Sequence, residues 1–145
     1  MGYGNTEVFL TPQQREALIQ SQLGKRAVVV IDRPVGYVHV TKGITLHYTL
    51  NYGFLPGIAG GDGEEQDVYV LGVPEPIDRF EGMIIGAIRR RDDNEDKLVA
   101  APVGMSFSAR EIAEATWFVE RYFDSTVQSI FDEGGGHEKD FSSEL

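Results

Sequence analysis

The sequence predicts a mainly β protein of the α+β class, built as a small barrel or curled sheet with two helices. The first observation is a series of short β-branched and apolar runs between residues 27 and 104, separated by turns rich in Gly, Pro and Asn. The second is a pair of helix-capping boxes, one before and one after this series. With 145 residues, the chain can form one domain with a real core but not two.

The N-terminal helix is predicted from its start signals. Thr11 is an N-cap, Pro12 occupies the first helical position, and Gln14 completes a capping box. We expect the helix to run to about Gln22 and to end near Gly24. Because it has few apolar residues, we expect residues 1–24 to form a helical appendage that rests on the domain.

The strands are predicted from the apolar and β-branched runs. The expected strands are residues 27–32, 37–40, 44–48, 68–73, 82–91 and 97–104. Lys42 and Gly43 form the turn between the second and the third of them. We expect residues 51–63 to be a loop, because this segment has five glycines and one proline in thirteen residues.

The second helix follows the last strand. Ser108 and Glu111 form its capping box, and apolar residues then recur on one face at helical spacing. The residues of that face are Ile112, Ala115, Val119, Tyr122 and Phe123. This face should pack on the barrel, so we expect one domain over residues 25–128. Residues 129–145 are rich in Gly and charged residues, and we expect them to be disordered.

Composition narrows the classes of function. The net charge of -10 repels nucleic acid and anionic membranes, so we expect neither as a partner. The absence of cysteine excludes disulfides, thiolate catalysis and cysteine-based zinc sites. No apolar run approaches the length of a membrane span, and the start of the chain does not resemble a signal peptide. The cytoplasm is the expected location.

The acidic residues gather in two short windows, each at the end of an expected strand. The windows hold eight of the 23 acidic residues: Asp62, Glu64, Glu65 and Asp67 in the first, and Asp92, Asp93, Glu95 and Asp96 in the second. Carboxylates within about 4–6 Å of one another oppose folding, and a hard divalent cation such as Mg²⁺, Mn²⁺ or Ca²⁺ removes that penalty. One such window alone is more simply a solvated acidic turn, whereas two of them favour a metal site.

Basic residues accompany the acidic windows. Lys97 adjoins the second window, residues 89–91 precede it, and Arg33 follows the first expected strand. Cations mixed with carboxylates suit an anionic substrate that bridges metals and basic side chains, as phosphates do. The three arginines at 89–91 have a plainer interpretation as countercharge on the surface, which we favour for them.

Residues 51–72, NYGFLPGIAGGDGEEQDVYVLG, resemble the signature region of soluble inorganic pyrophosphatases of the Mg²⁺-dependent, OB-barrel type. The second window, DDNEDKLVAAP, is similar to that family's next acidic loop, and DRPVGYVH and GDGEEQD resemble short variants of the family. The resemblance covers roughly residues 27–124. It implies an OB-like five-stranded barrel, hydrolysis of pyrophosphate to two phosphates by a metal-activated water, Mg²⁺ as cofactor with Mn²⁺ as the alternative, and a homo-oligomer.

The resemblance also implies roles for individual residues. Metal ligands would be Asp62, Asp67, Asp92 and Asp96, with Asp32 behind them at the end of an early strand. Glu64 would accept the proton of the nucleophilic water, with Asp67 beside it. The groups that hold phosphate oxygens and stabilise the leaving phosphate would be Tyr52, Lys97 and Tyr122.

The chain departs from the family in the groups that hold phosphate. A glutamate stands at position 64 where the family has an aspartate, and several basic residues of the family have no counterpart. Arg33 and His39 are candidates to replace them. Two alternatives to pyrophosphate hydrolysis therefore stay open: hydrolysis of a nucleotide or another organic phosphoanhydride or phosphoester, and a relative that binds metal or pyrophosphate without catalysis.

Overall fold

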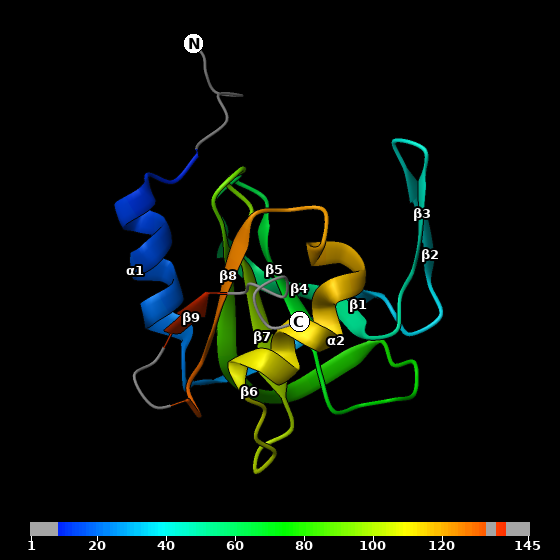
Figure 1. Cartoon of the computed structure of the whole chain (residues 1–145). Helices are drawn as coiled ribbons and strands as arrows, with labels where there is room; N and C mark the ends of the chain where they lie inside the picture. The colour runs from blue at the N-terminus through cyan, green and yellow to red at the C-terminus, as the bar shows by residue number, and fades with distance from the viewer. Residues whose placement is uncertain (1–8, 133–135, 139–145) are drawn as a thin grey trace.

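The computed structural model describes residues 9–132 and 136–138, and within them the chain forms two helices and nine strands (Figure 1). The helices are α1 (Pro12–Gln22) and α2 (Ala109–Glu120). The strands are β1 (Arg26–Arg33), β2 (Val38–Thr41), β3 (Ile44–His47), β4 (Asn51–Ala59), β5 (Glu65–Val70), β6 (Arg79–Arg90), β7 (Lys97–Ala101), β8 (Ser125–Ser129) and β9 (Gly136–Glu138).

Five of the strands close into a barrel. They pair in the order β1-β4-β5-β7-β6, and a further pairing of β1 with β6 completes the circle. The β5–β7 pair is parallel, and the other barrel pairs are antiparallel. β8 and β9 continue the sheet beyond β6, while β2 and β3 form a separate hairpin that stands away from the barrel (Figure 1). The predicted five-stranded barrel is confirmed.

The two-residue period of the strands divides the core into two layers. Val68 and Val70 on β5 belong to a cluster with contributions from all five barrel strands, which is the interior of the barrel. Tyr69 and Leu71 belong to a second cluster, which lies between the outer face of the barrel and α2. A parallel pair of buried strands at the centre explains why residues 68–71 and 98–101 are apolar without interruption.

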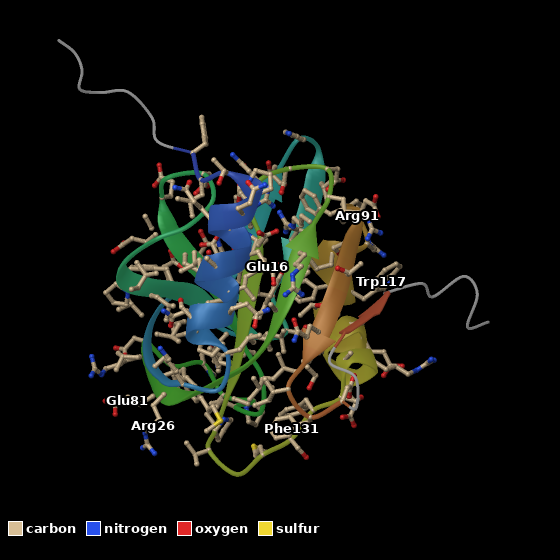
Figure 2. The ribbon with its side chains drawn as sticks, turned by 90° about the vertical axis from the view of Figure 1, so that its left-hand side faces the viewer. Glu16, Arg26, Glu81, Arg91, Trp117 and Phe131 are labelled. Carbon is tan, nitrogen blue, oxygen red and sulfur yellow. The ribbon has the colours of Figure 1, made fainter. Side chains whose placement is uncertain are left out.

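Helix α1 has the predicted start, with Thr11 as N-cap and a complete capping box. It lies beside the barrel, and Figure 2 looks onto it with Glu16 in view. Ile19, which the sequence analysis did not single out, is its one buried residue in the structure and packs with the interior cluster of the barrel. The division of the chain at residue 24 stays a prediction.

The predicted loop at residues 51–63 is wrong for its first part, because Asn51–Ala59 form β4. Gly53 is needed for the sheet, since a Cβ at this position would collide with the backbone carbonyl oxygen of Val30 on β1. Pro56 is exposed and lies where the pairing of β4 with β5 is interrupted, between Phe54 and Ala59. Glycine and proline therefore mark a close approach and an irregular strand here.

The end of the chain also differs in part from the prediction. Tyr122 and Phe123 lie in the turn after α2, and the strand β8 that follows was not predicted. Gly136–Glu138 pair with β8 and so are a strand in a segment predicted to be disordered. For residues 133–135 and 139–145, that prediction falls outside the described residues. Among the described helices, none is long and apolar enough to cross a membrane.

Candidate active site

A cavity of about 550 Å³ opens between the rim of the barrel, the β2–β3 hairpin and the turn that ends α2. Part of its lining is charged, and both acidic windows contribute to that part. The side chains that line the cavity are Asp32, Arg33, His39, Thr41, Lys42, Ile44, Leu46, Tyr48, Tyr52, Asp67, Arg90, Asp93, Glu95, Lys97, Val119, Tyr122 and Phe123.

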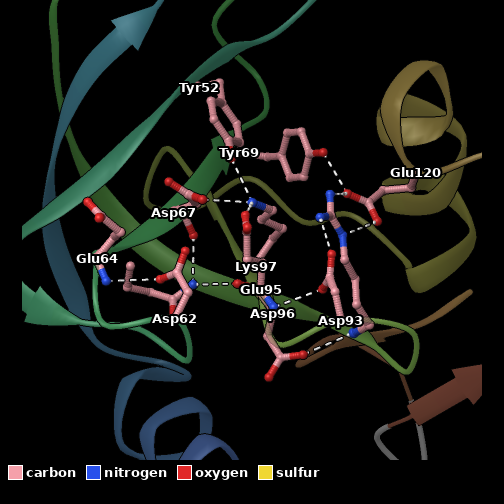
Figure 3. A network of polar contacts seen from close by, with 12 residues as sticks. Tyr52, Asp62, Glu64, Asp67, Tyr69, Asp93, Glu95, Asp96, Lys97 and Glu120 are labelled. Atoms are coloured by element: carbon pink, nitrogen blue, oxygen red, sulfur yellow. Dashed lines mark hydrogen bonds and ion pairs between the residues drawn. The ribbon is translucent and has the colours of Figure 1, made fainter. Parts of the chain in front are cut away.

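Lys97 is the centre of the polar network in this cavity (Figure 3). Its side chain is only 4% exposed, and Nζ donates hydrogen bonds to Asp67 Oδ2 at 2.7 Å, to Tyr52 Oη at 2.9 Å and to Glu95 Oε1 at 3.3 Å. Parallel pairing of β5 with β7 places Lys97 next to the β5 strand that carries Asp67. The two acidic windows thus meet at one ammonium group.

The protonation state of this centre follows from its surroundings. Burial opposes the charged form of Lys97, but the contacts with Tyr52 and Asp67 outweigh burial and raise the pKa of Lys97 above its ordinary value. Burial raises the pKa of Tyr52 well above its ordinary value, so the phenol keeps its proton. Near neutral pH, the cavity therefore presents an ammonium and a neutral phenol beside a carboxylate.

A second network lies behind the first. Arg90 donates to the Glu120 carboxylate from Nε at 3.1 Å and from Nη2 at 2.7 Å, and Tyr69 Oη donates to Glu120 Oε2 at 2.7 Å (Figure 3). Glu120 is fully buried, and burial raises the pKa of Tyr69, which stays a donor. Arg90 also contacts Asp93 at 3.3 Å and lies 3.5 Å from the ring centre of Phe123. This network joins Arg90, which lines the cavity, to helix α2.

Arg33 occupies an aromatic corner of the cavity. Its Nη1 donates to Tyr48 Oη at 2.7 Å, and its guanidinium lies 5.5–5.8 Å from the ring centres of Tyr37, Tyr48 and Tyr52. Such contacts hold the charge in place without neutralising it. Asp32 is the neighbouring acid, and partial burial raises its pKa from the ordinary value.

A small hollow lies beside the cavity, with a volume of about 10 Å³, the space of a single water-sized particle. Its lining is rich in oxygen atoms: Gly60, Gly61, Asp62, Glu65, Gln66, Asp67, Glu95 and Asp96. Asp67 and Glu95 belong to both spaces, so the hollow and the cavity adjoin. Oxygen-only donors of this kind suit Mg²⁺.

Asp96 is held by α1. Arg15 donates to its carboxylate from Nε at 2.9 Å and from Nη2 at 2.6 Å, and Nη2 also donates to the carbonyl oxygens of Arg90 and Asp93. The exposed fractions of the two side chains are 18% for Arg15 and 8% for Asp96. One guanidinium therefore ties the second acidic window to the N-terminal helix.

Arg15→Ala is expected to lower the free energy of unfolding by about 2 kcal/mol, because among the described residues it leaves the buried Asp96 carboxylate with the backbone amide of Arg90 as its one donor. Urea unfolding measures the change. Glu16→Gln is the matched control, since it removes the more exposed pair of the same helix with Arg89, worth less than about 1 kcal/mol. Equal destabilisation by the two substitutions would contradict the proposed importance of the Arg15 contact.

The structure brings most of the predicted site residues to these two spaces. The larger cavity holds Asp32, Arg33, His39, Tyr52, Asp67, Lys97 and Tyr122, and the small hollow holds Asp62, Asp67 and Asp96. Glu64 and Asp92, both among the described residues, line neither space. The backbone amide of Glu64 donates to Asp62 Oδ1 at 3.0 Å, and Asp92 Oδ2 accepts from the backbone amide of Asp124 at 3.0 Å.

Glu95 and Asp93 belong to the second acidic window but were given no individual role, and Arg90 was not a site candidate; all three line the cavity. Glu95 lies just before β7, two residues ahead of Lys97, and its membership of the second acidic window was the available signal. Asp96, between them, points toward Arg15 instead. The interpretation of residues 89–91 as surface countercharge is wrong for Arg90, which is buried against Glu120. That partner could not be predicted, because the pairing depends on how α2 docks.

The oxygen donors around the hollow suit a hard divalent cation in kind, but two of the carboxylates have other partners in this structure. Asp67 contacts Lys97, and Asp96 contacts Arg15. In the part of the chain that the structure describes, no three His, Asp or Glu side chains converge closely enough to hold an ion as they stand. Asp67, Asp62 and Glu95 nevertheless line the same hollow, so their carboxylates are close to one another in space.

Comparison with known proteins places this arrangement in a family. The family model described as inorganic pyrophosphatase matches residues 18–131. The chain therefore belongs to the inorganic pyrophosphatase family, as the resemblance of its two acidic loops indicated.

Individual relatives agree with this assignment. The chain is 35% identical over 81 residues to an inorganic pyrophosphatase of Ralstonia nicotianae, covering 50% of this chain and 45% of the relative. It is 31% identical over 87 residues to one of Xylella fastidiosa, covering 54% and 47%. The chain thus spans about half the length of the curated relatives it matches.

Solved structures share the fold. An inorganic pyrophosphatase from Ehrlichia chaffeensis superposes with a TM-score of 0.55 at 18% identity, over 75% of this chain and 88% of that one. One from Helicobacter pylori gives a TM-score of 0.51 at 19% identity, over 79% and 85%. At these identities, the likeness concerns the fold alone.

Proposed function

We propose that this protein hydrolyses inorganic pyrophosphate to two phosphates with Mg²⁺ as cofactor, and that Mn²⁺ can replace Mg²⁺. The observation that carries the proposal is the meeting of both acidic loops at Lys97, next to an oxygen-lined hollow. A cation and a polyanion can be held side by side there, which is the arrangement that phosphoryl transfer requires. Membership of the inorganic pyrophosphatase family supports the choice of substrate.

Asp62, Asp67 and Glu95 are the residues that would hold the metal ion, since all three line the hollow. Asp96 also lines the hollow and stays a predicted ligand, although its carboxylate is paired with Arg15. Asp92 is less suited to this role because its side chain accepts from the backbone of Asp124 outside the hollow. A bound Mg²⁺ supplies positive charge to the phosphate oxygens and lowers the pKa of a water molecule.

Lys97, Tyr52 and Arg33 would hold the phosphate groups. Each is a donor that keeps its proton near neutral pH, and each lines the cavity. The longest contact of Lys97, to Glu95, is the one that a phosphate oxygen would replace. Donors fixed in advance stabilise charge that develops on the departing phosphate without reorganisation of their surroundings.

Tyr122 and His39 remain proposed phosphate ligands at the edges of the cavity. Tyr122 is 44% exposed, and its hydroxyl now accepts from Arg121 at 2.8 Å. Glu64 remains the predicted proton acceptor by its place in the motif, but its position outside both spaces gives that role no support.

The proposal is tested by phosphate release from pyrophosphate in the presence of Mg²⁺, with Asp67→Asn as the critical variant. Asp67 lines both spaces, so its loss should lower kcat/KM about a hundredfold or more. Glu81→Gln serves as a control, since that carboxylate is exposed and lies outside both spaces. Equal phosphate release by the wild type and Asp67→Asn would reject the proposed site.

A further inference from the structure

The cavity is larger and less polar than an inorganic anion requires. Its volume of about 550 Å³ lies in the range of sites that hold organic ligands, which run from about 300 to 1,000 Å³. Pyrophosphate is a compact polyanion with no apolar surface. The charged network around Lys97 therefore accounts for only part of the space.

The remaining part of the lining is an apolar wall. We use that term for the side chains contributed by β3 and by the end of α2 with its following turn, which are Ile44, Leu46, Val119 and Phe123. Leu46 and Val119 are anchored in the core and form the base of the wall, whereas Ile44 and Phe123 are only partly buried. An apolar surface beside a phosphate site contributes nothing to the binding of a purely inorganic substrate, but it stabilises an organic group attached to the phosphates.

The shape of that organic group is indicated by what surrounds the wall. Tyr122 presents a half-exposed ring at the cavity, and the Phe123 ring is held by the Arg90 guanidinium at 3.5 Å. Rings of this kind favour a flat aromatic ligand. The β2–β3 hairpin adds the hydrogen-bonding side chains of Thr41 and Lys42 to the same lining, which suit sugar hydroxyls better than a hydrocarbon chain.

We propose that the cavity binds nucleoside diphosphates, with the diphosphate at Lys97 and the nucleoside against the apolar wall. The hydrolysis that would follow rests on the proposed function, whereas the binding does not. In that step, a water oxygen forms a bond to the terminal phosphorus as the bond from that phosphorus to the bridging oxygen breaks. The bridging oxygen keeps the electron pair and leaves on the nucleoside monophosphate. Orthophosphate and a proton are the other products.

Calorimetry with two non-hydrolysable probes, each in the presence of Mg²⁺, tests the binding. The probes are methylenediphosphonate, which has the diphosphate alone, and adenosine 5′-(α,β-methylene)diphosphate, which adds the nucleoside. We expect the nucleoside probe to bind about tenfold more tightly or better, because its ring and sugar cover the wall. Equal affinities, weaker binding of the nucleoside probe or no binding of it would overturn the proposal.

Two variants test whether the tighter binding of the nucleoside probe comes from the apolar wall. Ile44→Ala shortens the apolar wall on β3, and the ratio of the two affinities should fall toward one. Val40→Ala is the matched control on the same hairpin, because Val40 is 66% exposed and does not line the cavity. If the affinity ratio of the Ile44→Ala protein stayed as high as that of the Val40→Ala protein, the nucleoside would bind elsewhere. That result would overturn the proposal.

Hydrolysis assays on pyrophosphate separate this inference from the proposed function. Pyrophosphate hydrolysis without preference for the nucleoside probe would leave the proposed function standing and overturn the inference. Preference for the nucleoside probe without hydrolysis of pyrophosphate would support the inference and contradict the proposed function.

Discussion

Lys97→Met is expected to lower kcat for pyrophosphate about a hundredfold to a thousandfold, the largest effect on activity that the structure predicts for a single side chain. Lys97 contacts Asp67, Tyr52 and Glu95 and is the one ammonium at the meeting of the two acidic loops in the described part of the chain. Methionine matches the apolar stem of lysine as far as Cε but lacks the ammonium, so the phosphate would meet three oxygen-bearing groups without their central cation.

Steady-state phosphate release at saturating Mg²⁺ measures this effect. Lys25→Met is the control, because Lys25 is exposed and lines neither the cavity nor the hollow. Circular dichroism of each variant establishes that the fold is retained. A Lys97→Met protein that is folded and turns over pyrophosphate within about threefold of the wild type would remove Lys97 from the proposed site.

Glu120→Ala should have the largest effect on stability, lowering the free energy of unfolding by about 3–5 kcal/mol. Glu120 is fully buried and receives two hydrogen bonds from Arg90 and one from Tyr69. Its removal leaves the Arg90 guanidinium, which is 4% exposed, without its bidentate partner. For a chain of this size, the expected fall in Tm is about 10 °C.

Thermal unfolding followed by circular dichroism measures the fall in Tm. Glu114→Ala on the same helix is the matched control, because Glu114 forms an exposed pair with Arg110 that contributes less than about 1 kcal/mol. If Glu120→Ala and Glu114→Ala lowered Tm equally, the buried network of Glu120 with Arg90 and Tyr69 would not stabilise the fold as described.

The fold could be predicted largely because its signals are local. The β-branched runs gave most of the barrel strands, and the capping boxes at Thr11 and Ser108 gave both helix starts. β4 was missed because glycine and proline usually interrupt strands, whereas Gly53 is required by the close approach of β1. That requirement is a property of the assembled sheet and cannot be seen in the segment alone.

The residues of the candidate site that belong to sequence motifs were predicted, whereas contacts that depend on how the helices pack were not. Asp67, Lys97 and Tyr52 meet in the structure as their motifs suggested they could. Asp96 was a natural ligand by its spacing, but docking of α1 brings Arg15 to it, and Glu95 faces Lys97 instead. The apolar wall depends on the hairpin and α2 coming together, so the sequence alone could not reveal it.

The most direct test of the account is a phosphorus NMR time course of pyrophosphate with the wild-type protein, Mg²⁺ and, in a parallel sample, excess EDTA. The account predicts that many equivalents of pyrophosphate per protein are converted to orthophosphate with Mg²⁺ and that EDTA stops the conversion. Persistence of the pyrophosphate signal with Mg²⁺ present, or conversion at the same rate with EDTA, would contradict it.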